Sequence, residues 1–133
     1  MTDAVRIAIE RDIDIVSARQ AGRTLAQQIG FTSTEQTLIA TAISEVARNI
    51  VVYAKFGEIE LAPAHDDGRD GILVIARDRG PGIADVALAL RDGYSTERSL
   101  GMGLPGARRL MDDFDIQSLV GRGTTVTMKK WRR

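Results

Sequence analysis

The chain has 133 residues, 44% hydrophobic and 27% charged, which is the composition of one soluble globular domain covering residues 1–133. Its 18 basic and 18 acidic residues cancel, so no overall charge favours nucleic acid or a membrane as a partner. The absence of cysteine excludes disulfides and thiol catalysis, and the single histidine, His65, excludes metal sites made of several histidines.

The sequence favours a cytoplasmic location. Its N-terminus has no signal-peptide pattern, and we expect no apolar run to approach the length that crosses a membrane. The lack of cysteine fits a reducing compartment.

The first part of the chain predicts one strand and two helices. Residues 5–10 (VRIAIE) alternate apolar and polar side chains, as a half-buried strand does. Residues 12–29 have apolar side chains at helical spacing, and the glycine that follows provides a left-handed stop. Residues 33–54 keep the helical period over a greater length, and Ser33 and Gln36 have the spacing of a capping box.

Two polar side chains, Glu45 and Asn49, interrupt the second helical pattern. They are four residues apart, so they project from nearly the same face of the helix. One interpretation is a helix edge that faces solvent, and the other is a site for magnesium and proton transfer. The spacing alone leaves both open.

The remaining residues predict four strands and two more helices. Asp78 ends the densest apolar run, and the Gly-x-Gly turn before the last strand indicates a hairpin. In order, the elements are a strand at 58–62, a polar link at 63–70, a strand at 71–77, a short helix at 85–90, a helix from the 101–106 segment to about residue 113, and strands at 114–120 and 124–131. This order favours a two-layer α/β (α+β) sandwich with a mixed, mostly antiparallel sheet and helices on one face.

Asp78 directly precedes a tight turn in the segment DRGPG. By itself this pattern is that of an acidic residue starting a turn. The functional interpretation is a carboxylate that accepts a hydrogen bond from the exocyclic amine of adenine, where guanine has a carbonyl. Such a charged hydrogen bond is worth ~1.5–3 kcal/mol, which is enough for selectivity.

The segment GMGLPG, residues 101–106, matches the pattern G-x-G-x-x-G. A dinucleotide-binding fold would require a strand before this pattern and an acidic residue ~20 positions after it. Residues 95–99 are polar and residues 121–127 contain no acid, so we reject that interpretation. The segment is either a phosphate-binding helix start or a loop without a ligand.

Taken together and in order, these motifs resemble those of the GHKL (Bergerat-fold) ATP-binding family. The series is E-x-x-x-N on a helix, then D-x-G-x-G, G-x-G-x-x-G and G-x-G-T, and it covers nearly the whole chain. Because no dimerisation helix with a phosphoacceptor histidine is present, the chain resembles the small bacterial serine/threonine kinases that regulate anti-sigma systems. The segments EVARNIVVYA, DRGPGI and GMGLPGARRLMDDF are most similar to the switch kinases of the stressosome, whereas anti-sigma-factor kinases usually continue as E-A-V-T-N-A.

The resemblance implies ATP and Mg²⁺ as cofactors and assigns roles to nine residues. Glu45 would be the catalytic base, and Asn49 would bind the Mg²⁺ that bridges the phosphates. The rest would contact the nucleotide: Asp78 and Thr124 near adenine, Gly80 and Gly82 beside the nucleotide, and Gly101, Gly103 and Gly106 around the phosphates. Residues 95–100 would form a short lid.

The function implied by the resemblance is an ATP- and Mg²⁺-dependent protein-serine/threonine kinase. Its substrates would be STAS-domain antagonist and scaffold proteins, and after release it would bind and activate a PP2C-type phosphatase. Two alternatives stay open at this point: an anti-sigma-factor kinase that binds a sigma factor, and a nucleotide-dependent binding switch without kinase activity.

Overall fold

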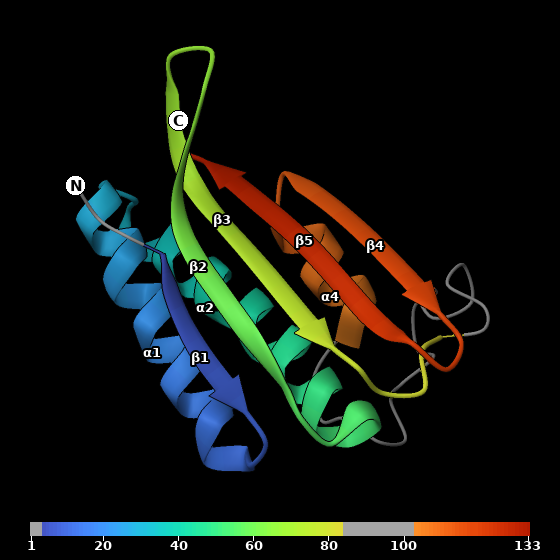
Figure 1. Cartoon of the computed structure of the whole chain (residues 1–133). Coiled ribbons are helices and arrows are strands. Elements are labelled where there is room, and N and C mark those ends of the chain that lie inside the picture. The colour runs from blue at the N-terminus through green and yellow to red at the C-terminus, as the bar shows by residue number, and fades with distance from the viewer. Residues whose placement is uncertain (1–3, 84–102) are drawn as a thin grey trace.

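In the described part of the chain, five strands form one antiparallel sheet and three α-helices cover one of its faces (Figure 1). The computed structural model describes residues 4–83 and 103–133. The elements are β1 (Val5–Ile9), α1 (Asp12–Ile29), α2 (Ser33–Asn49), the π-helical turn η1 (Ile50–Ala54), β2 (Gly57–Asp66), β3 (Arg69–Asp78), α4 (Gly103–Leu110), β4 (Asp113–Leu119) and β5 (Gly123–Trp131). The predicted two-layer sandwich is confirmed.

The sheet has the strand order β1-β2-β3-β5-β4, and every pairing between described strands is antiparallel. Along the central strand β3, Ile72, Val74 and Ala76 are buried beneath the helices, while Leu73 and Ile75 face the other side and are half-buried. The hairpin predicted between the last two strands is confirmed as β4–β5. The short helix expected at residues 85–90 and the lid at 95–100 lie outside the described residues.

The start of α2 differs from the predicted capping box by one residue. Thr32 is the N-cap: its Oγ1 accepts from the N–H of Glu35 at 3.2 Å, and Glu35 Oε1 accepts from the N–H of Thr32 at 3.0 Å. Gln36 instead donates its amide to the carbonyl of Phe31 at 2.9 Å. The Ser33–Gln36 prediction is wrong because Ser33 is already the first helical residue.

The run Ser33–Ala54 is long and apolar enough, by length and composition, to cross a membrane. The expectation that no apolar run approaches that length is therefore wrong. Half of its most apolar window is buried inside the domain, and Ile39, Ile43 and Val46 are among the core residues. The run is apolar because it packs against the sheet and lies between α1 and α4, as the central helix of the helical layer (Figure 1).

Residues 63–70, expected to be a polar link, form the end of a long β2–β3 hairpin. Only Asp67 and Gly68 lie outside the strands, and both have positive φ, at 51° and 78°. Two positive φ angles are typical of the two-residue turns that match strand twist, and Asp-Gly is a preferred sequence for them. His65 therefore lies in a strand, exposed, with its Nδ1 2.6 Å from Asp70 Oδ1.

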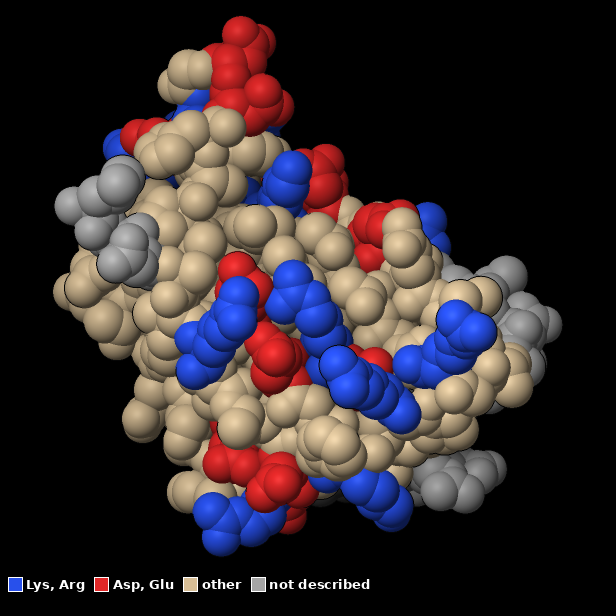
Figure 2. Space-filling view, viewed as in Figure 1, with Lys and Arg blue, Asp and Glu red and all other residues tan. Residues whose placement is uncertain are grey.

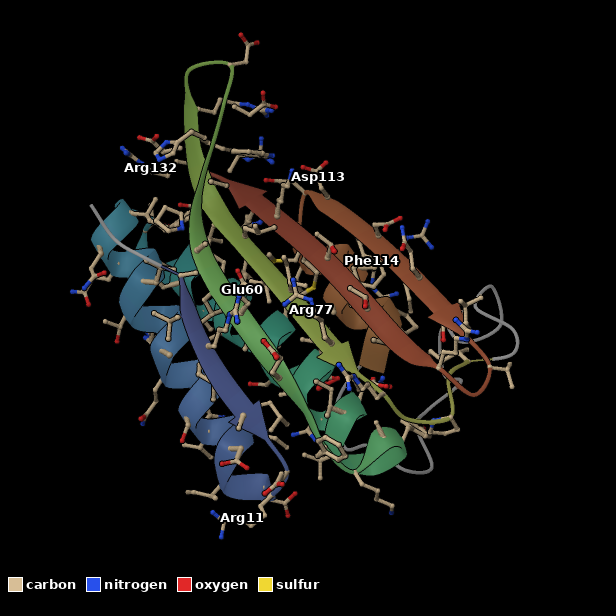
Figure 3. The ribbon with its side chains drawn as sticks, viewed as in Figure 1. Arg11, Glu60, Arg77, Asp113, Phe114 and Arg132 are labelled. Atoms are coloured by element: carbon tan, nitrogen blue, oxygen red, sulfur yellow. The ribbon has the colours of Figure 1, made fainter. Side chains whose placement is uncertain are left out.

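The uncovered face of the sheet has charges of both signs close together. Arg77 on β3 lies 2.9 Å from Glu60 on β2, measured from Nη1 to Oε1, and Figure 3 shows the two side chains on neighbouring strands. Arg6 and Glu58 extend the cluster through contacts of 3.7–4.0 Å. Figure 2 shows blue and red side chains side by side over this face, which agrees with the balanced composition.

Candidate nucleotide site

The predicted site residues gather at one end of the sheet, where β3 ends and β5 begins (Figure 1). Glu45 and Asn49 are on the last two turns of α2, Asp78 ends β3, Gly103 begins α4 and Thr124 is the second residue of β5. Antiparallel pairing places Asp78 opposite Thr124. The fold therefore brings helix, turn and hairpin residues to a common place although they are up to 79 positions apart in sequence.

Glu45 is buried, with 5% of its surface exposed. Its Oε1 lies 2.6 Å from Arg48 Nη1, and its Oε2 accepts a hydrogen bond from the backbone N–H of Gly103. Gly103 is the first residue of α4, where unsatisfied N–H groups and the helix dipole favour a negative charge. The interpretation of Glu45 as a solvent-facing edge is therefore wrong.

Asn49 is half-buried at the end of α2, one turn beyond Glu45. Its carboxamide makes no capping bond, and no hydrogen bond between described residues involves it. The helix then continues as a π-turn that closes with the N–H of Lys55 donating to the carbonyl of Ile50 at 2.9 Å. Single π-turns occur frequently at functional sites, and this one directly follows the candidate magnesium ligand.

Asp78 has one oxygen that the protein holds in place. Its Oδ1 accepts from the N–H of Gly80 at 2.9 Å and from the N–H of Thr124 at 3.2 Å. Among the described residues, 4–83 and 103–133, none donates a hydrogen bond to the other oxygen, Oδ2. The carboxylate is thus oriented by two backbone donors and keeps an acceptor for a ligand.

Two glycines allow the Asp78 turn to fit between η1 and the β4–β5 hairpin. A Cβ at Gly80 would lie 2.6 Å from the Cβ of Ala54 in η1, so only glycine permits this packing. A Cβ at Gly123 would lie 2.1 Å from the Asp78 carbonyl oxygen, and Gly123 also has φ at +112°. The sequence prediction omitted Gly123, although it is the second glycine of the G-x-G-T motif.

A cavity of about 590 Å³ opens beside Asp78, within the size range of small-molecule sites. Its lining includes Asp78, Thr124, Ser118 and the apolar side chain of Ile116. Thr124 Oγ1 lies 2.8 Å from Ser118 Oγ, and Ser118 Oγ accepts from the N–H of Ile83 at 2.6 Å. Sequence reasoning missed Ser118 because a single serine on an alternating strand carries no signal.

The structure places the other predicted glycines unequally. Gly82 has φ at +78° and lies against the carbonyl of Leu119 in the β4–β5 hairpin. Gly106 is buried within α4. Gly101 lies outside the described residues. The structure thus joins Glu45 to Gly103 and Asp78 to Thr124. These are the residues to which the sequence resemblance assigns the phosphate end and the adenine end of the site.

Comparison with known proteins shows the family and the fold. Residues 10–130 match the family model of the histidine kinase-like ATPase domain. The crystal structure of the RsbU and RsbW domains of Rv1364c from Mycobacterium tuberculosis superimposes with a TM-score of 0.67 over 99% of this chain, at 24% identity. The chain spans 33% of that solved chain, and the likeness shows a shared fold.

Two groups of curated relatives cover most or all of the chain. Serine/threonine-protein kinase RsbT of Bacillus subtilis (strain 168) is 47% identical over 133 residues, which is 100% of both proteins. Anti-sigma F factors of Caldanaerobacter subterraneus subsp. tengcongensis and Geobacillus stearothermophilus are 34% and 31% identical over 86% and 85% of this chain, and over 82% and 81% of their own lengths. This protein therefore belongs to the histidine kinase-like (GHKL) ATPase family, as an ATP-using serine/threonine-protein kinase.

Proposed function

We propose that the protein transfers the γ-phosphoryl group of ATP to a serine or threonine of STAS-domain antagonist and scaffold proteins. The system would be a cytoplasmic, stressosome-type partner-switching module. The observation that carries the proposal is the buried Glu45 carboxylate at the start of the glycine-motif helix. It occurs in a chain that is similar over its whole length to a protein named as a serine/threonine kinase.

In the proposed reaction, the hydroxyl oxygen of the acceptor forms a bond to the γ-phosphorus. The bond from that phosphorus to the β–γ bridging oxygen breaks, and ADP leaves with the electron pair. Glu45 accepts the hydroxyl proton, a contribution worth ~10²–10⁴ in rate for a general base. Asp78 Oδ2 accepts from the adenine amine, and the N–H groups at the start of α4 bind phosphate oxygens.

The residues present fit a magnesium ion that takes most of its ligands from phosphate and water. Asn49 offers a half-buried carboxamide oxygen, a hard donor of the kind that Mg²⁺ prefers. Within the described ranges no group of three His, Cys, Asp or Glu side chains gathers as a protein-only cage would require. When bound, the ion would neutralise charge that develops on the phosphates.

The decisive experiment incubates γ-labelled ATP and Mg²⁺ with the protein and STAS proteins of its source organism. We expect label on a serine or threonine of at least one STAS protein, and a rate lower by about 10²–10⁴ for Glu45→Gln. Asp115→Asn, on the exposed side of β4, is the matched carboxylate control and should keep the wild-type rate. Folded protein that labels none of the STAS proteins would overturn the proposed substrate class.

The proposed second activity is binding to a PP2C-type phosphatase after the kinase has been released from its phosphorylated partner. A pull-down with phosphorylated and unphosphorylated STAS protein present tests this order of events. We expect the phosphatase to be captured only after phosphorylation. Capture that does not depend on phosphorylation would contradict partner switching.

A second candidate function is the binding of a sigma factor, which the similarity to anti-sigma F factors favours. Against it, Arg48 and Ile50 stand where the E-A-V-T-N-A pattern of anti-sigma-factor kinases has threonine and alanine. Co-expression with each sigma factor of the source organism tests this candidate. A sigma factor that co-purifies with the protein, and does so more strongly with ATP, would support this candidate. If no sigma factor co-purifies, the proposed function is phosphorylation of STAS proteins alone.

A further inference from the structure

Arg48 forms an ion pair with Glu45, the candidate base, yet neither the motifs nor the family match assigns Arg48 a role. We infer that Arg48 is a positioning residue: it holds Glu45 through Oε1 so that Oε2 is the oxygen that accepts the proton. The inference rests on the proposed kinase reaction and deepens it. It concerns which atom of the base reacts and what keeps that atom in place.

The ion pair lies at the boundary between the core and solvent. The Glu45 side chain is 4% exposed and that of Arg48 is 33% exposed, with 2.6 Å between Oε1 and Nη1. Burying a carboxylate is costly unless it is paired and hydrogen-bonded. The two residues are three positions apart on α2, so the helix itself sets their relative placement.

The two oxygens of Glu45 differ in how easily a ligand can displace their partners. A guanidinium does not lose its proton in proteins, so Arg48 stays a charged donor to Oε1 throughout the reaction. The N–H of Gly103, which donates to Oε2, belongs to the first turn of α4 and to the glycine motif proposed to bind phosphate. This donor is therefore the one that a phosphate oxygen competes for.

This difference predicts the order of events at Glu45. When a phosphate oxygen takes the Gly103 N–H, Oε2 loses its only backbone donor among the described residues. The carboxylate then has one charge-assisted bond, to Arg48, which keeps it from turning away. Oε2 becomes the available acceptor for the hydroxyl proton at the moment when nucleotide is bound.

Without Arg48, the carboxylate would have no fixed partner once phosphate is bound. It would then sample several orientations, and misplacement of a catalytic group by about 1 Å can cost ~10² in rate. Nucleotide contacts at Asp78 and Thr124 lie at the other end of the site and would be retained. A positioning role thus predicts a loss in kcat, whereas a role in ATP binding predicts a rise in KM.

The test measures kcat and the KM for ATP in transfer to a STAS acceptor for Arg48→Met and Arg48→Lys. It repeats Arg48→Met in the Glu45→Gln background, under single-turnover conditions. We expect Arg48→Met to lower kcat about 10- to 100-fold with the KM for ATP within about two-fold, and Arg48→Lys to recover part of the loss. In the Glu45→Gln background, Arg48→Met should have no further effect, because the group it positions is gone.

Arg19→Met, an exposed arginine on α1, is the matched control and should keep the wild-type kcat. The fluorescence of Trp131, the single tryptophan, checks that each variant is folded. A wild-type kcat in Arg48→Met, or an equal fold loss with and without Glu45, would overturn the inference while the kinase reaction stands. Equal rates for wild type and Glu45→Gln would instead overturn the assignment of the base in the proposed function.

Discussion

At the scale of single residues, the carboxylates of Asp78 and Glu45 are oriented in a similar way. In each carboxylate the protein fixes one oxygen: Asp78 Oδ1 accepts from two backbone N–H groups, and Glu45 Oε1 pairs with Arg48. In the proposed reaction the second oxygen of each, Asp78 Oδ2 and Glu45 Oε2, acts on the ligand. Because the protein already holds one oxygen, the carboxylate loses little conformational freedom when it binds a ligand or reacts. The sequence motifs mark both residues, but only the structure shows which partner each oxygen has.

Asp78→Asn should weaken ATP binding by about 10- to 100-fold. The substitution removes the charge from a hydrogen bond worth ~1.5–3 kcal/mol and allows an amide N–H₂ group to face the adenine amine. Calorimetric titration with ATP and with GTP measures the effect. The preference for ATP should shrink, and an unchanged ATP affinity would remove Asp78 from adenine recognition.

Asn49→Ala should abolish the strengthening of ATP binding by Mg²⁺. The carboxamide oxygen is the proposed protein ligand, and alanine offers no replacement oxygen. Titrations with ATP in Mg²⁺ and in a chelator, for wild type and variant, check this directly. In the chelator the two proteins should bind alike, whereas a full magnesium effect in the variant would contradict the assignment.

At the scale of elements, the N-cap of α2 is Thr32 in the structure, whereas the sequence pattern predicted Ser33. Thr32→Ala removes the side chain that accepts the Glu35 N–H, so we expect a loss of about 1 kcal/mol in the free energy of unfolding. Ser33→Ala, one residue along, should change it by less than about 0.5 kcal/mol. Denaturant unfolding followed by Trp131 fluorescence compares the two, and the opposite ranking would restore Ser33 as the cap.

The start of α1 gives a pH dependence with a definite sign. Backbone N–H groups of Arg11 and Glu10 donate to Asp14 at 2.9 Å, and they hold the pKa of this carboxyl below its ordinary value of 3.8. A lowered pKa in the folded state means that the charged carboxylate stabilises the fold above the unfolded-state pKa. This contribution is lost as the pH falls through the lower folded-state pKa.

Asp14→Asn should therefore destabilise the protein at neutral pH, and the difference from wild type should shrink in strong acid. In strong acid the wild-type carboxyl is protonated and resembles the amide. Denaturant unfolding of both proteins across the acid range measures the effect. A difference that stayed constant with pH would show that the two backbone bonds do not favour the charged form.

At the scale of the whole molecule, the site depends on the packing of the Asp78 turn against η1, which is closest at Gly80. Gly80→Ala places a methyl group against Ala54 in η1, and its φ lies outside the left-handed region, so the effect is steric. We expect a loss of about 1–3 kcal/mol in stability and weaker ATP binding, because the Asp78 turn must move. Calorimetric titration with ATP and denaturant unfolding measure the two effects.

Gly68→Asn, at the open tip of the β2–β3 hairpin, is the matched control. Nothing lies within 4 Å of its Cβ position, and asparagine tolerates the left-handed conformation better than most residues. ATP affinity should stay at the wild-type value in this variant. An equal loss of ATP affinity in both variants would mean that the packing at Gly80 does not shape the site.

Much of the architecture could be predicted from sequence because it follows local rules. The 3.6-residue period predicts α1 and α2, and period-two alternation predicts β1 and the first half of β2. The dense apolar run predicts β3, and the G-x-G turn predicts the β4–β5 hairpin. The errors were also local, since Asp-Gly at residues 67 and 68 was read as part of a polar link rather than as a hairpin turn. The cap at Thr32 was missed because Ser33 stands beside it with an equally good pattern.

By itself, the sequence determined the fold class, the type and order of the described elements and the identities of the motif residues. These depend on side-chain period, backbone freedom and chemical type, which neighbouring residues in the chain express. Only the tertiary structure decided that Glu45 is buried, that Arg48 and Gly103 share its carboxylate, and that Ser118 and Gly123 complete the Asp78 site. Those contacts join distant segments through packing of the sheet and helices, and a one-dimensional pattern does not specify which atoms such packing brings together.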